Sequence, residues 1–142
     1  MKLVDLNVLL YAINEDAREH SKVHRWWESA LNGDEPIGLA WTVVLGFLRL
    51  VTRAGLLPRP LTPTDALDTV QEWLDHPLIV VVHPGDAHWP RFRTLVEATG
   101  FAGNLTTDAH LAALAIEYDA TLYSTDRDFK RFAGIRVKNP AQ

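Results

Sequence analysis

The sequence predicts an α/β fold, in which a central parallel sheet is covered by helices on both faces. Short apolar segments with strand character alternate along the chain with longer segments whose apolar residues recur at helical spacing. This alternation is typical of parallel strands joined by crossover helices. The chain has 142 residues, of which 47% are hydrophobic, and this suffices for one well-buried core. We therefore expect a single domain over residues 1–142.

The first half of the chain predicts two strands and three helices. Strands are expected at residues 2–5 and 37–41, and helices from about residue 7, at 20–32 and at 42–54. Gly33 ends the second helix, and Pro36 precedes the second strand. Prolines at positions 58, 60 and 63 then form a linker that is too short to separate two domains.

The second half continues the same alternation. Helices are expected at residues 64–76, 87–99 and 106–118, and strands at 78–82, 121–125 and 135–137. The segment 78–82 is an unbroken apolar, mostly β-branched run, which is typical of a strand buried on both faces. The segment 106–118 is apolar almost all round, and this predicts a central buried helix.

Composition excludes several classes of function. The chain has no cysteine, so disulfides, thiol nucleophiles and thiolate metal sites are excluded, and a reducing compartment fits. The net charge of −4 argues against a broad electrostatic nucleic-acid binder, although an enzyme that grips phosphate through a metal ion remains compatible. The N-terminal stretch does not read as a signal peptide, and no apolar run approaches the roughly 20 residues that span a bilayer. We therefore expect a cytoplasmic protein with no membrane partner.

Four aspartates occur where strands end or a helix begins, in three separate segments. Asp5 ends the first strand, Asp108 lies in the first turn of the apolar helix, and Asp126 and Asp128 follow the strand at 121–125. In an open α/β sheet, ligands bind at the edge formed by the carboxyl ends of the strands. We therefore expect the four carboxylates to lie close together at this edge.

Each acid also has an ordinary structural explanation. Asp5 can cap the helix that follows it, worth about 1 kcal/mol, and Asp108 can complement a helix dipole, worth roughly 0.3–1 kcal/mol. Asp126 and Asp128 fit a polar turn. Gathered at one edge, however, the carboxylates would repel one another unless some took up protons or a cation neutralised them. Because no His/Cys set of the zinc type is present, Mg²⁺ and metal-assisted hydrolysis of a phosphodiester fit best.

Three segments together resemble a PIN domain. They are Val-Asp-Leu-Asn-Val-Leu-Leu-Tyr-Ala around Asp5, Thr-Thr-Asp-Ala-His-Leu-Ala-Ala-Leu-Ala around Asp108, and Ser-Thr-Asp-Arg-Asp-Phe at 124–129. The chain length and the run Trp-Thr-Val-Val-Leu-Gly-Phe-Leu-Arg-Leu-Val-Thr at 41–52 further resemble the VapC toxins of type II toxin–antitoxin modules. The resemblance covers essentially the whole chain.

This resemblance implies an endoribonuclease that depends on Mg²⁺ or Mn²⁺, cuts RNA and is held inactive by a cognate antitoxin. It also implies a homodimer. The residues that it implies as catalytic acids and metal ligands are Asp5, Asp108 and Asp126. The residues that it implies in supporting roles are Asn7, Thr125 and Asp128.

One position departs from the family pattern. The family usually keeps a glutamate on the helix after the second strand, and alignment of Leu-Gly-Phe-Leu-Arg puts Phe47 there. A two-metal site needs carboxylates that bridge ions roughly 4 Å apart. We therefore expect one well-held ion, with a second bound weakly or only with substrate.

Other side chains are weaker candidates. Arg49 and Arg53, four apart, form either a solvated helix face or donors to RNA phosphates. His110 points to a different helix face from Asp108 and is expected to be structural or exposed. Trp26 and Trp27 are expected in the core, and an exposed remainder would suit an antitoxin helix.

Two other functions compete with the nuclease. A phosphotransferase or phosphatase with Asp5 as nucleophile fits poorly, because residue 7 is Asn and no lysine follows a third strand in the right place. A degenerate PIN-like or receiver-like binding module without nuclease activity is the non-enzymatic alternative, with Phe47 as the sign of a lost site. A nuclease requires both Asp108 and Asp126, whereas a receiver does not.

Overall fold

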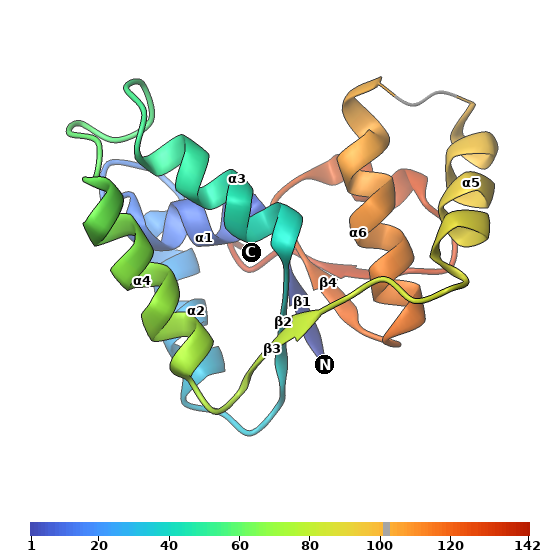
Figure 1. Cartoon of the computed structure of the whole chain (residues 1–142), viewed down its shortest axis with the longest axis horizontal. Coiled ribbons are helices and arrows are strands. Elements are labelled where there is room, and N and C mark those ends of the chain that lie inside the picture. The colour runs from blue at the N-terminus through green and yellow to red at the C-terminus, as the bar shows by residue number, and fades with distance from the viewer. Residues whose placement is uncertain (101–102) are drawn as a thin grey trace.

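A parallel sheet runs through the middle of the molecule in the computed structural model, which describes residues 1–100 and 103–142 (Figure 1). Within these residues the sheet has five strands, in the order β3-β2-β1-β4-β5. The strands are β1 (Lys2–Val4), β2 (Ile37–Ala40), β3 (Ile79–Val82), β4 (Thr121–Tyr123) and β5 (Arg136–Lys138). Every neighbouring pair is parallel. The predicted α/β architecture is confirmed.

Helices cover both sides of this sheet. They are α1 (Leu6–Ile13), α2 (His20–Leu31), α3 (Trp41–Val51), α4 (Pro63–Asp75), α5 (His88–Thr99) and α6 (Thr106–Glu117). Short 3₁₀ turns, η1 (Gly103–Leu105) and η2 (Arg127–Arg131), precede α6 and follow β4. Figure 1 shows α1 to α4 gathered on the left of the sheet and α5 with α6 on the right. None of the helices in the described part of the chain combines the length and apolarity needed to cross a membrane.

The core is continuous from the central strands to α6. Leu3 and Val4 of β1 and Leu122 of β4 are fully buried. On α6 the five consecutive residues 111–115 are also buried, as expected for the predicted central helix. This packing fixes β1 and β4 side by side, and the residues that follow these two strands form the candidate site.

Strand β3 differs from the prediction. It lies at the edge of the sheet and pairs only with β2, so Val80 is 39% exposed rather than buried. The apolar sequence therefore marked a strand correctly but not its place in the sheet, because strand order is set by tertiary packing.

Helix α3 also ends earlier than predicted. The hydroxyl of Thr52 donates to the Leu48 carbonyl at 2.6 Å, and the Leu61 backbone N–H donates to the Val51 carbonyl at 2.8 Å. These bonds satisfy the final carbonyls without another helical turn. As a result Arg53 lies beyond the helix and does not share a helical face with Arg49. At the other end, β2 stops at Ala40, one residue before the predicted end.

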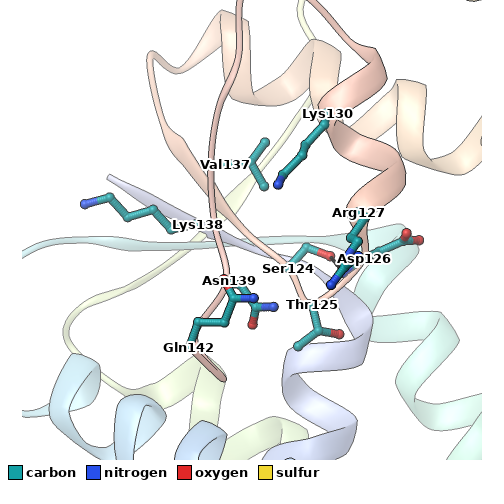
Figure 2. Close-up of a pocket in the computed structure, with 9 residues that line it drawn as sticks. All are labelled: Ser124, Thr125, Asp126, Arg127, Lys130, Val137, Lys138, Asn139 and Gln142. Atoms are coloured by element: carbon teal, nitrogen blue, oxygen red, sulfur yellow. Dashed lines mark hydrogen bonds between the residues drawn. The ribbon is translucent and has the colours of Figure 1, made fainter.

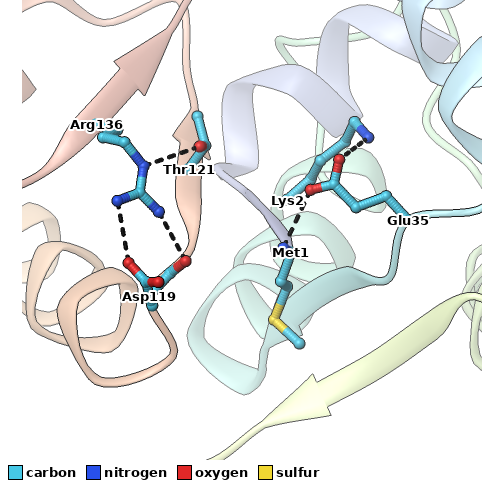
Figure 3. Close-up of polar contacts among 6 residues, drawn as sticks. All are labelled: Met1, Lys2, Glu35, Asp119, Thr121 and Arg136. Atoms are coloured by element: carbon cyan, nitrogen blue, oxygen red, sulfur yellow. Dashed lines mark hydrogen bonds and ion pairs between the residues drawn. The ribbon is translucent and has the colours of Figure 1, made fainter.

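Ion pairs tie the amino-terminal ends of the strands. Glu35 accepts from the N-terminal ammonium at 3.0 Å and from Lys2 at 2.7 Å, and Arg136 pairs with Asp119 at 3.0 Å (Figure 3). Ion pairs near the protein surface contribute about 0–1 kcal/mol each. They lie at the opposite end of the strands from the four aspartates, so they help align the strands without touching the candidate site.

Candidate active site

The site forms where two central strands end beside each other. The Asp5 backbone N–H donates to the Tyr123 carbonyl at 3.0 Å, which extends the β1–β4 pairing to the end of both strands. From β1 the chain crosses to β2 and β3 on one side, while β4 and β5 lie on the other. Open α/β sheets bind ligands at such a reversal of strand order, beyond the carboxyl ends of the strands.

Asp5 is held rigidly at this point. It is 8% exposed; its Oδ1 accepts from the Leu6 backbone N–H at 2.7 Å and its Oδ2 from the Ser124 hydroxyl at 2.7 Å. The first bond makes Asp5 the N-cap of α1. Asp5 can therefore cap α1 and belong to the candidate site at the same time, because Oδ1 binds the start of α1 and Oδ2 binds Ser124 after β4.

Ser124 is the residue that sequence reasoning missed. Its hydroxyl oxygen accepts from the Asp126 backbone N–H at 2.9 Å and from the Asn7 side-chain amide at 3.2 Å, while the hydroxyl donates to Asp5. One buried hydroxyl thus links the residues that follow β1 to those that follow β4. The available signal was a serine at the end of an apolar strand and directly before the acids.

Asn7 and Thr125 reinforce this link. The Asn7 side-chain oxygen accepts from the Thr125 backbone N–H at 3.2 Å. Thr125 contributes here through its backbone, whereas Asn7 uses both ends of its amide. The first turn of α1 is therefore fastened to the turn after β4.

Three carboxylates converge beside Asp5. Asp108, Asp126 and Asp128 each place one oxygen so that all three oxygens lie within 4.8 Å of one another. Asp108 comes from the first turn of α6, and Asp126 accepts from the Asp128 backbone N–H at 2.9 Å. Among the described residues, Asp128 rather than Asp5 completes this trio, and Asp5 lies next to it.

The electrostatics of the site are unfavourable without a cation. Burial, followed by the negative charges of Asp5, Asp126 and Asp128, raises the pKa of Asp108 to about 7. Burial also raises the pKa of Asp5, although its bonds from Ser124 and Leu6 oppose the rise. The donors are all carboxylate oxygens, which a hard divalent ion such as Mg²⁺ prefers. The residues present therefore fit such an ion.

A cleft of about 560 Å³ opens from these acids toward α3. Asp5 and Asp108 line it together with Thr42, Leu45 and Arg49. Arg49, one of the two predicted RNA-contacting arginines, thus faces the acids, whereas Arg53 is exposed beyond the end of α3 and is not among the residues that line this cleft.

Phe47 does not face the cleft. It is 0% exposed and packs edge-on against Trp73, with ring centroids 4.7 Å apart. A glutamate at position 47 on this backbone would point into the core. Since the sequence of α3 holds no acidic residue, this helix contributes Arg49 rather than a carboxylate to the cleft.

A polar pocket of about 340 Å³ borders the acids on the side of β5. Figure 2 shows Lys130 pointing toward Val137, while Lys138 points away from the other residues drawn. Arg127 and Lys130 form no ion pair with another residue in the described ranges. The pocket therefore offers two uncompensated cations next to Asp126.

The remaining candidates are structural in part. Trp27 is buried, and Trp26 is half-buried against Tyr123 with ring centroids 4.5 Å apart. His110 is also half-buried, and its Nδ1 lies 2.9 Å from Nε2 of His88. Burial, and then the neighbouring His88, lower the pKa of His110.

Comparison with known proteins identifies the family. The PIN-domain family model matches residues 2–135. The chain belongs to the PIN-domain family. It is 44% identical over 140 residues to Ribonuclease VapC37 of Mycobacterium tuberculosis, covering 99% of this chain and 97% of that protein. Ribonuclease VapC33 of the same organism is 41% identical, over 99% of this chain and 98% of that protein. This PIN domain therefore groups with the VapC toxins, as the sequence analysis predicted.

Solved structures agree on the PIN fold. VapBC2 from Rickettsia felis, bound to a DNA fragment from its promoter, has a TM-score of 0.72 at 17% identity and covers 97% of each chain. The Mycobacterium tuberculosis toxin VapC20, described as cleaving the sarcin–ricin loop, has a TM-score of 0.68 at 18% identity. It covers 96% of this chain and 99% of that one. The range matched by the family model includes all four aspartates of the site.

Proposed function

We propose that this PIN domain is a divalent-metal-dependent endoribonuclease and the toxin of a type II toxin–antitoxin module. The observation that carries the proposal is the convergence of four aspartates from three segments at the β1–β4 edge, with the pKa of Asp108 raised to about 7. Relatives named VapC ribonucleases, similar over nearly the whole chain, support the same activity.

Asp108, Asp126 and Asp128 would hold Mg²⁺ or Mn²⁺. Asp5, next to them, would be a further ligand of the ion or a hydrogen-bond acceptor beside it. Such an ion, when bound, lowers the pKa of a water molecule and offsets charge on the phosphate. The chain itself supplies positioning: Ser124 fixes Asp5 relative to the turn that carries Asp126. A misplacement of about 1 Å at such a site costs roughly 100-fold in rate.

The walls of the cleft suit an RNA backbone. Arg49 faces the acids from α3, where it can donate charge-assisted hydrogen bonds to a phosphate oxygen. Arg127 and Lys130, on the other side of Asp126, can hold a flanking phosphate. Local cations of this kind allow a protein of net charge −4 to bind RNA at one cleft.

The partners follow from the same proposal. The solved neighbours include VapBC and FitAB complexes, and we propose a cognate antitoxin that covers the cleft and a homodimeric toxin. Trp26 lines a shallow pocket with Lys22, Arg25 and Ser29. This mixed aromatic and basic surface suits an antitoxin segment with apolar and acidic side chains.

The degenerate-module alternative rests on the absence of the family glutamate at position 47. Phe47 lies in the core, and α3 brings no carboxylate to the cleft in its place. The alternative is still separable by experiment from the nuclease.

The test is cleavage of total cellular RNA by the purified, antitoxin-free protein with Mg²⁺, with Mn²⁺ and with EDTA. Asp126→Asn is the test variant, and Asp68→Asn, an exposed acid on α4, is the matched control. We expect metal-dependent cutting by the wild type and the control, and loss in Asp126→Asn. A folded, metal-bound wild type that cuts no RNA would instead favour the binding module.

A further inference from the structure

An aromatic pocket of about 350 Å³ adjoins the acid cleft. It lies between the start of α5 and the start of α6, and Thr42 and Thr107 line both the pocket and the cleft. A ligand that extends out of the cleft past these two threonines therefore enters the pocket directly. The proposed metal chemistry does not use this space.

Aromatic rings of α5 form one wall of the pocket. Trp89 and Phe92 are nearly parallel, with centroids 5.7 Å apart and an interplanar angle of 24°. His88 lies 6.4 Å from Phe92 at 28°. Trp89 is 66% exposed, the most exposed of the large apolar side chains in the described part of the chain. Core packing therefore does not account for its position.

The rest of the lining comes from Thr42 and from Thr106, Thr107 and His110 of α6, and the surface that faces the pocket is mostly apolar. Nε2 of His88 lies 2.9 Å from Nδ1 of His110, which links the two imidazole rings. No Asp, Glu, Lys or Arg is among the described residues that line the pocket. Such a lining suits the flat face of a neutral ring and does not suit a phosphate.

We propose that this pocket binds one unpaired nucleobase of the RNA, stacked on Trp89, while the adjoining phosphodiester lies at the acids. The proposal rests on the proposed ribonuclease function and names how that site selects its substrate. Proteins that read single-stranded RNA stack splayed bases on aromatic, histidine or arginine side chains. Loss of one such contact weakens binding by roughly 5- to 150-fold.

The test combines protein and RNA variants in one cycle. A short single-stranded RNA that the wild type binds is prepared with an abasic nucleotide at each position in turn. Cleavage kcat/KM with Mg²⁺ and binding affinity in EDTA, by fluorescence anisotropy, are measured for wild type, Trp89→Ala and Leu67→Ala. Leu67 is 56% exposed on α4 and serves as the matched control for loss of an exposed apolar side chain.

We expect Trp89→Ala to lower kcat/KM and affinity roughly tenfold on the intact RNA. At one position, the abasic nucleotide should lower kcat/KM and affinity roughly tenfold for the wild type and for the Leu67→Ala control. The same abasic RNA should bind and react with Trp89→Ala almost as the intact RNA does. Trp89→Phe should restore most of the loss. If the abasic nucleotide lowers kcat/KM and affinity equally in wild type and Trp89→Ala at every position, the proposal that a base stacks on Trp89 is refuted.

Two further outcomes separate the alternatives. If Trp89→Ala changes the oligomeric state in light scattering and loses activity equally on all RNAs, the pocket is a contact between copies of the chain and the proposal is rejected. If the wild type binds RNA with the expected Trp89 coupling in EDTA but never cuts it, the base pocket stands and the nuclease function fails.

Discussion

Replacing Asp108 by asparagine is expected to stabilise the metal-free protein at neutral pH. The Asp108 carboxyl has a pKa of about 7 in the folded chain, against an ordinary pKa of 3.8 for an aspartate side chain. If the whole pKa rise contributed to stability, it would correspond to roughly 4 kcal/mol of folding free energy. Because the carboxyl is only half-buried, solvent screening reduces the expected gain to about 1–2 kcal/mol.

The direction follows from proton linkage. A carboxyl whose pKa is raised on folding binds a proton more tightly in the folded state, so stability falls as pH rises from about 4 to about 7. Asparagine carries no charge at any of these pH values. The stability difference between Asp108→Asn and wild type should therefore grow across this window and stay constant above it.

The assay is urea unfolding of wild type, Asp108→Asn and the exposed control Asp68→Asn in EDTA at pH 4.5 and pH 8. The same proteins are then unfolded with Mg²⁺ at pH 8. An ion at 100 times its Kd would stabilise the wild type by about 2.7 kcal/mol, and the variant much less. An Asp108→Asn protein that is no more stable than wild type at pH 8 in EDTA would refute the view that the acids repel one another. Equal stabilisation of both proteins by Mg²⁺ would refute the role of Asp108 as a ligand.

Three other substitutions test the neighbouring structure. Ser124→Ala should destabilise the protein by about 1–3 kcal/mol in urea unfolding, because it leaves the buried Oδ2 of Asp5 without its donor; the exposed Ser21→Ala serves as control. Phe47→Ala should cost about 3–5 kcal/mol through a core cavity, yet leave Mg²⁺ affinity in calorimetry unchanged if the variant folds. Lys130→Ala should reduce the slope of log affinity against log salt for single-stranded RNA by about 0.7, the share of one phosphate.

Much of the fold was predictable because it follows from local patterns. The alternation of apolar strand segments with amphipathic helices defines a parallel sheet, and a parallel sheet brings the ends of separate strands to one edge. Asp5 and Asp126 could therefore be expected to meet although 120 residues lie between them in the chain. Asp108 could be added because α6 is otherwise apolar and buried.

The remaining features depend on tertiary packing that local patterns do not record. Val80 is exposed because β3 occupies the sheet edge, and strand order is not written into a strand's own sequence. Arg49 faces the cleft and Phe47 faces the core because of the way α3 packs against α1 and α4. The ring pair of His88 and His110 joins residues 22 apart through the packing of α5 on α6.

The four acids of the site play two different structural parts. Asp5 is bound by hydrogen bonds on both oxygens, so its charge is partly compensated by the chain itself. No hydrogen bond from another described residue holds the Asp108 carboxylate, and its pKa carries the large rise. Asp5 therefore maintains the geometry of the β1–β4 junction, whereas Asp108 leaves the negative charge that a cation would relieve. We therefore expect loss of Asp5 to disturb the folded site itself, and loss of Asp108 to remove a repulsion among the acids.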